Sequence, residues 1–118
     1  IALKYVQLNE ARATSLSFPR MPTSHQAMIY QRSYMLEHEY DESFRVSGDF
    51  EHFCRFLKNR ASWIRVPITL SRFYSGGVSS SNKRTLFYES SRTISKFSAI
   101  KILIPIRILV LWLRIYVK

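Results

Sequence analysis

Cysteine, glycine and proline are scarce in this sequence, and each scarcity excludes a class of protein. Among 118 residues there are one cysteine, Cys54, three glycines and four prolines. A single cysteine excludes an internal disulfide framework. So few glycines and prolines leave little material for long flexible linkers. A hydrophobic content of 47% and an aromatic content of 14% argue against a wholly disordered chain. The length therefore predicts one small domain with extensions.

Acidic residues are almost absent from the second half of the chain. Residues 1–51 carry five Lys/Arg and seven Asp/Glu, whereas residues 52–118 carry thirteen Lys/Arg and one acid, Glu89. The net charge of +10 is therefore concentrated in one half. Such a segment repels itself in water unless it lies beside phosphate, anionic lipid or an acidic partner.

Motifs for catalysis, nucleotides or metals are also lacking. The loop SGGVSSSNKR (75–84) has no GxxxxGK[ST] spacing, so a phosphate-binding loop is not expected. His52 and Cys54 lie two residues apart, and a helix would point them to different faces. The HEYDE run (38–42) is interpreted as a hydrated acidic surface. We expect no enzyme activity, no cofactor and no metal site.

The first half predicts an N-terminal arm and a helical hairpin. Pro19 and Pro22 end an arm at 1–22, and residues 23–66 form the hairpin unit. Apolar residues at three-, four- and seven-residue steps predict helices at about 24–47 and 50–64. Gly48 would end the first helix and Asp49 would cap the second, which must stop before Pro67.

The second half predicts a basic segment at 67–99 followed by an apolar, cationic segment at 100–118. The β-prone runs at about 68–74 and 84–88 flank a glycine- and serine-rich loop, so a β-hairpin is possible. Of the last nineteen residues, fourteen are Ile, Leu, Val, Trp or Tyr. They suit a strand or a helix, and we favour a helix at about 105–117, because proline is tolerated in a first helical turn. The expected fold is mostly α or small α+β.

The basic residues of the second half predict an RNA surface. Arginine outnumbers lysine twelve to six, which favours bidentate phosphate contacts. Phe73 and Tyr74 are candidates for base stacking. The candidate phosphate contacts are Arg55, Lys58, Arg60, Arg65, Arg72, Lys83, Arg84, Arg92 and Lys96. We therefore expect a structural RNA-binding component of a large ribonucleoprotein, in contact with rRNA and neighbouring proteins.

Two further readings concern location and the last segment. The Arg- and Ser-rich, acid-poor composition of residues 71–101 favours a mitochondrial protein, such as a mitochondrial ribosomal subunit protein. Charges within residues 100–118 disfavour a simple membrane span. The alternative is an accessory subunit of a respiratory or other organellar membrane complex. It would contact an anionic membrane, or transmembrane partner subunits, through Arg107, Trp112, Arg114 and Tyr116. The segment could also add a strand or helix to a protein partner.

Overall fold

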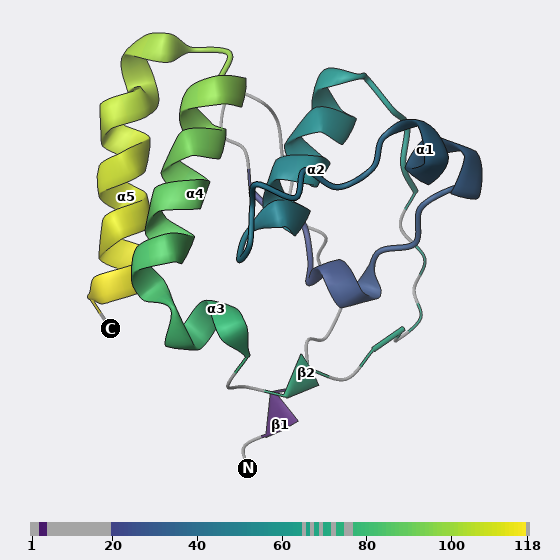
Figure 1. Ribbon diagram of the computed structural model, residues 1–118, viewed down its shortest axis with the longest axis horizontal. Coiled ribbons are helices and arrows are strands. Elements are labelled where there is room, and N and C mark those ends of the chain that lie inside the picture. Colours follow the sequence, from purple (N-terminus) through teal and green to yellow (C-terminus); the bar gives the residue numbers. More distant parts are fainter. Residues whose placement is uncertain are drawn as a thin grey trace.

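Three helices organise the protein, and the computed structural model describes residues 3–4, 20–64, 66, 68, 70–71, 73–74 and 77–117. These helices are α2 (Gly48–Lys58), α4 (Lys83–Phe97) and α5 (Ile104–Tyr116). Helices α4 and α5 lie side by side and antiparallel, and α2 packs on the other side of α4 (Figure 1). The shorter elements are η1 (His25–Ala27), α1 (Arg32–Glu37), α3 (Val78–Ser81), η2 (Lys101–Leu103), β1 (Leu3–Lys4) and β2 (Phe73–Tyr74). The fold is mostly α.

The apolar core lies between α2 and α4. Its buried hydrophobic residues are Phe44, Phe53, Cys54, Phe56, Ile94 and Phe97. The rings of Phe53 and Phe56 stack with centroids 6.0 Å apart. The apolar face that the spacing predicts for the second hairpin helix is confirmed at Phe53, Cys54 and Phe56. It does not extend to Ile64, which lies beyond the end of α2 and is 87% exposed.

The predicted helix over 24–47 is wrong. The chain forms only η1 and the six-residue helix α1 there, and residues 38–47 are not helical. The carbonyl of His38 instead contacts His52 Nε2 at 2.9 Å, and the carbonyl of Glu39 accepts from Arg55 at 2.7 Å. Side chains of α2 thus form hydrogen bonds with backbone carbonyls that would otherwise bond within a helix. These tertiary contacts override the local periodicity.

Helix α2 is shorter than predicted, ending at Lys58 instead of residue 64. Arg60 adopts a left-handed conformation with φ 54°. The amide of Ala61 donates to the carbonyl of Phe56 at 3.3 Å, and that of Arg60 donates to Leu57 at 3.1 Å. This pair of bonds is the Schellman pattern that closes a helix C-terminus. Gly48, predicted to end the preceding helix, is the first residue of α2.

The predicted β-hairpin is also wrong. Residues 84–88, expected as its second strand, lie inside α4, while β2 pairs with β1 in an antiparallel bridge. The side chain of Asn82 caps α4 by accepting from the amide of Thr85 at 3.3 Å. Across the full helix, Ile94 and Phe97 are buried together with Ser90 and Thr93. A helical period over fifteen residues therefore outweighs the β propensity of five.

The predicted C-terminal helix at 105–117 is confirmed, since α5 spans Ile104–Tyr116 and has Pro105 in its first turn. A proline there costs no intrahelical hydrogen bond. Helix α5 covers α4 on the side away from α2, and Phe87 contacts Tyr116 with ring centroids 6.0 Å apart (Figure 1).

Candidate nucleic-acid interface

The outer surface of α4 carries a stripe of cations around one aromatic ring. Arg84, Tyr88, Arg92 and Lys96 recur at four-residue steps, and all four are exposed. Successive members lie about 6 Å apart along the helix axis and share one side of it. Tyr88 is 66% exposed in the middle of the stripe. We call this set the α4 stripe.

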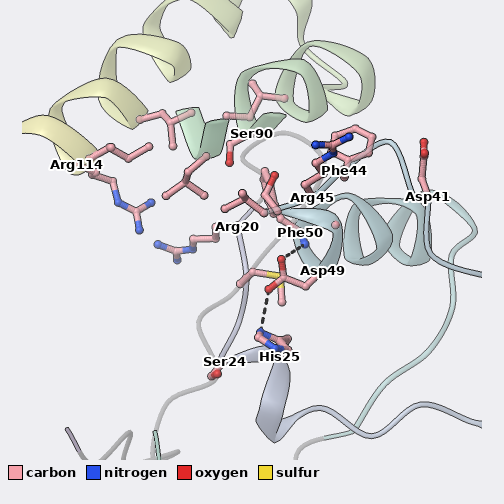
Figure 2. A pocket seen from close by; sticks show the side chains of 18 of the residues that line it. Arg20, Ser24, His25, Asp41, Phe44, Arg45, Asp49, Phe50, Ser90 and Arg114 are labelled. Carbon is pink, nitrogen blue, oxygen red and sulfur yellow. Dashed lines mark hydrogen bonds and ion pairs between the residues drawn. The ribbon is translucent and has the colours of Figure 1, made fainter. Parts of the chain in front are cut away.

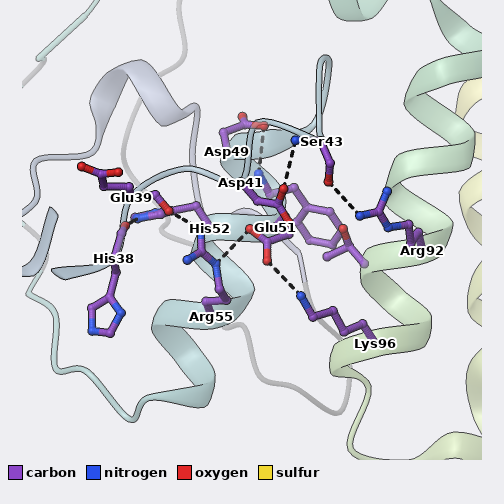
Figure 3. A network of polar contacts seen from close by, with 12 residues as sticks. His38, Glu39, Asp41, Ser43, Asp49, Glu51, His52, Arg55, Arg92 and Lys96 are labelled. Carbon is purple, nitrogen blue, oxygen red and sulfur yellow. Dashed lines mark hydrogen bonds and ion pairs between the residues drawn. The ribbon is translucent and has the colours of Figure 1, made fainter. Parts of the chain in front are cut away.

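Two members of the α4 stripe are held in place by the neighbouring loop and by α2. Arg92 donates to Ser43 Oγ at 2.8 Å, and its guanidinium carbon lies 4.2 Å from the centre of the Phe44 ring. Lys96 Nζ lies 3.5 Å from Glu51 Oε1 (Figure 3). Ser43 is neutral, and a guanidinium has five donors. Arg92 therefore keeps its charge and several donors for an external phosphate.

Arg55, another predicted phosphate contact, is engaged within the protein. Its Nε lies 3.0 Å from Oε2 of Glu51, a carboxylate that is fully buried. Its guanidinium also donates to the carbonyl of Glu39 (Figure 3). Arg55 and Lys96 therefore offset the charge of a buried acid, and Arg55 ties α2 to the preceding loop. We give Arg55 a structural role beside the predicted one.

The other predicted phosphate contacts are spread over two places. Lys83 is exposed at the start of α4, next to Arg84. Lys58 and Arg60 are exposed at the end of α2, where Lys58 Nζ lies 5.9 Å from the centre of the Phe97 ring. Arg65 and Arg72 lie outside the described residues. Phe73 and Tyr74 form β2, and base stacking by either stays a prediction.

Helix α5 buries one of its two arginines and exposes several large apolar residues. Arg107 is buried, with an exposed fraction of 5%. Trp112 and Tyr116 lie on the outer side, where their rings contact each other at 5.9 Å between centroids. The exposed large apolar residues of this outer face are Ile102, Ile106, Leu109, Trp112, Leu113, Tyr116 and Val117. Of the contacts predicted for lipid or a partner, Trp112, Arg114 and Tyr116 are exposed, whereas Arg107 is buried.

Glu89 is the one acid among residues 52–118, and its role was not predicted from the sequence. Its carboxylate is buried and accepts the backbone amides of Arg45, Val46 and Ser47 at 2.7, 2.9 and 2.8 Å. Burial alone would raise the pKa of Glu89, but these hydrogen bonds outweigh it and lower the pKa. Glu89 thus binds the last three backbone amides before α2, including that of its N-cap residue Ser47, and places a negative charge at the N-terminus of α2.

The candidate ligands for soft metals are used in packing. Burial lowers the pKa of His52, whose ring lies among the rings of Tyr30, Tyr34 and Tyr40. Burial also raises the pKa of the Cys54 thiol to about 12. Within the described ranges, no group of three His, Cys, Asp or Glu side chains could hold a metal ion. Nor does any helix in those ranges combine the length and apolarity needed to cross a membrane.

Comparison of the chain with protein-family models, with curated proteins and with solved structures finds no match. The α4 stripe and the outer face of α5 are therefore interpreted from their own chemistry.

Proposed function

We propose that this protein is a structural RNA-binding subunit of a large organellar ribonucleoprotein, such as a mitochondrial ribosome, and that the α4 stripe contacts RNA. The α4 stripe is the observation that carries the proposal. It aligns Arg84, Arg92 and Lys96 on one side of α4, with Tyr88 between Arg84 and Arg92. Arginine supports bidentate phosphate contacts, and an exposed tyrosine ring offers a stacking surface for an unpaired base.

The position of Lys83 and Arg84 supports a role in binding. Both cations lie in the first turn of α4, where the partial positive charge of the helix N-terminus makes a cation unfavourable. Neither has an ion pair with an acid among the described residues. Lys83 and Arg84 therefore do not stabilise the helix. A bound phosphate would offset the repulsion between these two cations and the helix N-terminus.

Salt dependence of RNA affinity tests the α4 stripe. With Lys83, Arg84 and Arg92 each neutralising one phosphate, and Lys96 paired with Glu51, the log–log slope of affinity against salt is expected to be about −2 for single strands. Arg84→Gln should make that slope shallower by about 0.7. Tyr88→Ala should weaken binding by roughly 1–3 kcal/mol and leave the slope unchanged, because stacking releases no counterions. Filter binding or fluorescence anisotropy across a salt series measures both.

Arg32→Gln provides the matched control, because Arg32 is an exposed arginine on α1, away from the α4 stripe. It should leave the slope as in the wild type. A flat salt response, or the same slope change in the Arg84 and Arg32 variants, would contradict the proposal. Since Arg84 and Tyr88 are exposed, neither substitution should disturb the fold.

The outer face of α5 favours a second candidate function, an accessory subunit bound to an organellar membrane. This face is apolar and aromatic, and exposed Lys101 lies at its start. Lys83 and Arg84 are near its other end, since α4 begins where α5 ends (Figure 1). An apolar helix face bordered by cations suits the surface of an anionic bilayer. In the first candidate function, a neighbouring protein of the assembly would cover this face.

Vesicle sedimentation separates the two candidate functions. If α5 binds membrane, Leu109→Asp should reduce co-sedimentation with anionic vesicles at least about tenfold, because an apolar contact is replaced by a charge that anionic lipid repels. Leu36→Asp, at a similarly exposed leucine on α1, serves as the control. No sedimentation of the wild type, or an equal loss in both variants, would remove the membrane candidate. Release of the native protein from its assembly by ribonuclease would support the RNA candidate.

A further inference from the structure

A cavity of about 1060 Å³ lies on the inner side of α5. Helices α4 and α5 form one wall, and the segment before η1, the loop before α2 and the first turn of α2 form the others. The cavity is distinct from both surfaces described above, since no residue of the α4 stripe and none of the exposed apolar residues named for α5 lines it. Its volume is at the upper end of those typical of small-molecule sites.

Arginines reach this cavity from three segments of the chain. Arg107, which is buried, and Arg114, which is exposed, lie two helical turns apart on α5, and both line it. Arg45 lines it from the loop before α2. Arg20 enters from the chain segment on the opposite side (Figure 2). Figure 2 shows the side chains of Arg20 and Arg114 directed toward the same space. Arg107 is deeper in the protein, where its charge is less screened by water.

The wall around these arginines is apolar. Leu86 on α4 and Val110, Leu111 and Ile115 on α5 line the cavity beside Arg114. These side chains offer a hydrocarbon surface several residues long, next to a cluster of guanidinium groups. A ligand that matches both features has an anionic head and an apolar chain.

The acids that line the cavity lie away from Arg114. Asp49 forms an ion pair with His25 at 3.0 Å, and Asp41 accepts from the amide of Ser43 at 2.9 Å. Figure 2 places Asp41 on the far side of the view from Arg114. Glu42 lines the cavity next to Asp41 in the sequence. Asp41 thus lies on the opposite side of this view from Arg114, and Arg45, on the same loop as Asp41, also lines the cavity.

We propose that this cavity binds an amphiphile with one acidic head group, a carboxylate or a phosphate monoester. The head group lies between Arg20 and Arg114, where guanidinium groups form charge-assisted, bidentate hydrogen bonds. The hydrocarbon chain lies along Leu86, Val110 and Leu111, so that it leaves water. The proposal is independent of RNA binding, because it uses the inner face of α5 and not the outer surface of α4.

Calorimetric titration of the full chain tests this proposal with four probes, each kept below its critical micelle concentration. Decanoate and decyl phosphate carry the two head groups, decanol lacks the charge, and inorganic phosphate lacks the chain. We expect one or both charged amphiphiles to bind at least tenfold more tightly than decanol and than inorganic phosphate. The tighter of the two charged amphiphiles identifies the head group.

Three variants locate the binding. Arg114→Gln and Arg20→Gln should each weaken the charged amphiphile at least tenfold and leave decanol unchanged. Arg84→Gln, the same substitution on the α4 stripe, should leave amphiphile binding as in the wild type. Arg114→Gln should in turn leave the salt dependence of RNA affinity unchanged, so that failure of either proposal is seen separately. Arg107 is left intact because it is buried.

Three results would overturn the proposal. Equal affinity for decanol and for both charged amphiphiles would show that the arginines do not recognise a head group. Affinity for inorganic phosphate equal to that for the tighter charged amphiphile would show a plain anion site without a chain-binding wall. Unchanged affinity in both the Arg114 and Arg20 variants would place the ligand elsewhere.

Discussion

Replacing Glu89 by glutamine is expected to lower the free energy of unfolding by about 3 kcal/mol. The buried carboxylate accepts three backbone amides and the hydroxyl of Ser47. Glutamine keeps the shape but presents an amide nitrogen where one oxygen was, and it removes the charge at the N-terminus of α2. At least one amide among Arg45, Val46 and Ser47 would then be left without an acceptor. Chemical denaturation of both proteins measures the difference.

The Glu89 variant should also change how stability depends on pH. The pKa of Glu89 is below its ordinary value of 4.5 in the folded protein. A group with a depressed folded pKa binds more protons when unfolded, so its contribution is complete above pH 4.5 and is lost as the pH falls through the folded pKa. The wild type should therefore lose more stability on acidification below pH 4.5 than the glutamine variant does.

Glu37→Gln is the control for this pair, because Glu37 is an exposed acid on α1. Its unfolding free energy should stay within about 0.5 kcal/mol of the wild type. If the Glu89 variant matched the wild type in both its denaturation midpoint and its loss of stability at acid pH, the role assigned to this carboxylate would be wrong.

Replacing Phe53 by alanine should destabilise the protein by about 4 kcal/mol. The side chain is only 1% exposed and stacks on Phe56 in the core between α2 and α4. Alanine would leave a cavity that the surrounding helices can fill only in part. Since the apolar core of a domain this small is limited, the loss is a large part of the total stability. Thermal or denaturant unfolding followed by circular dichroism measures it.

Two comparison variants separate cavity formation from other effects. Phe53→Leu retains most of the apolar volume and should cost clearly less than alanine. Leu36→Ala removes an apolar side chain that is 60% exposed, so it should change stability by no more than about 0.5 kcal/mol. Equal costs at positions 53 and 36 would mean that the core does not lie where α2 meets α4.

The sequence predicts elements well where the hydrophobic period and local capping agree. The buried face of α2 follows from the spacing of its apolar residues, and the start of α5 follows from Pro105, which is tolerated in a first helical turn. Residues 38–47 could not be predicted, because their backbone is bound by His52, Arg55 and Glu89 from elsewhere in the chain. Periodicity carries no information on such contacts.

The candidate site shows the same limit. Charge alone singles out Arg84, Arg92 and Lys96, but their alignment with Tyr88 follows only when residues 83–97 form a helix. The predicted strand over 84–88 concealed it. The inward direction of Arg107 was also not predictable, because a period shows which residues share a face and not which face turns inward. The isolation of Glu89 in a basic half was the one available signal for its role.

The cap on α2 has a consequence for the order in which the protein can fold. Glu89 follows Ser47 by 42 residues, so the three amides that lead into α2 have no carboxylate acceptor until the middle of α4 has been synthesised. A short helix gains little stability by itself in water. During synthesis, the first half of the chain therefore waits for the second half, and an incomplete polypeptide that stops before α4 should expose Phe53 and Phe56 to chaperones and proteases.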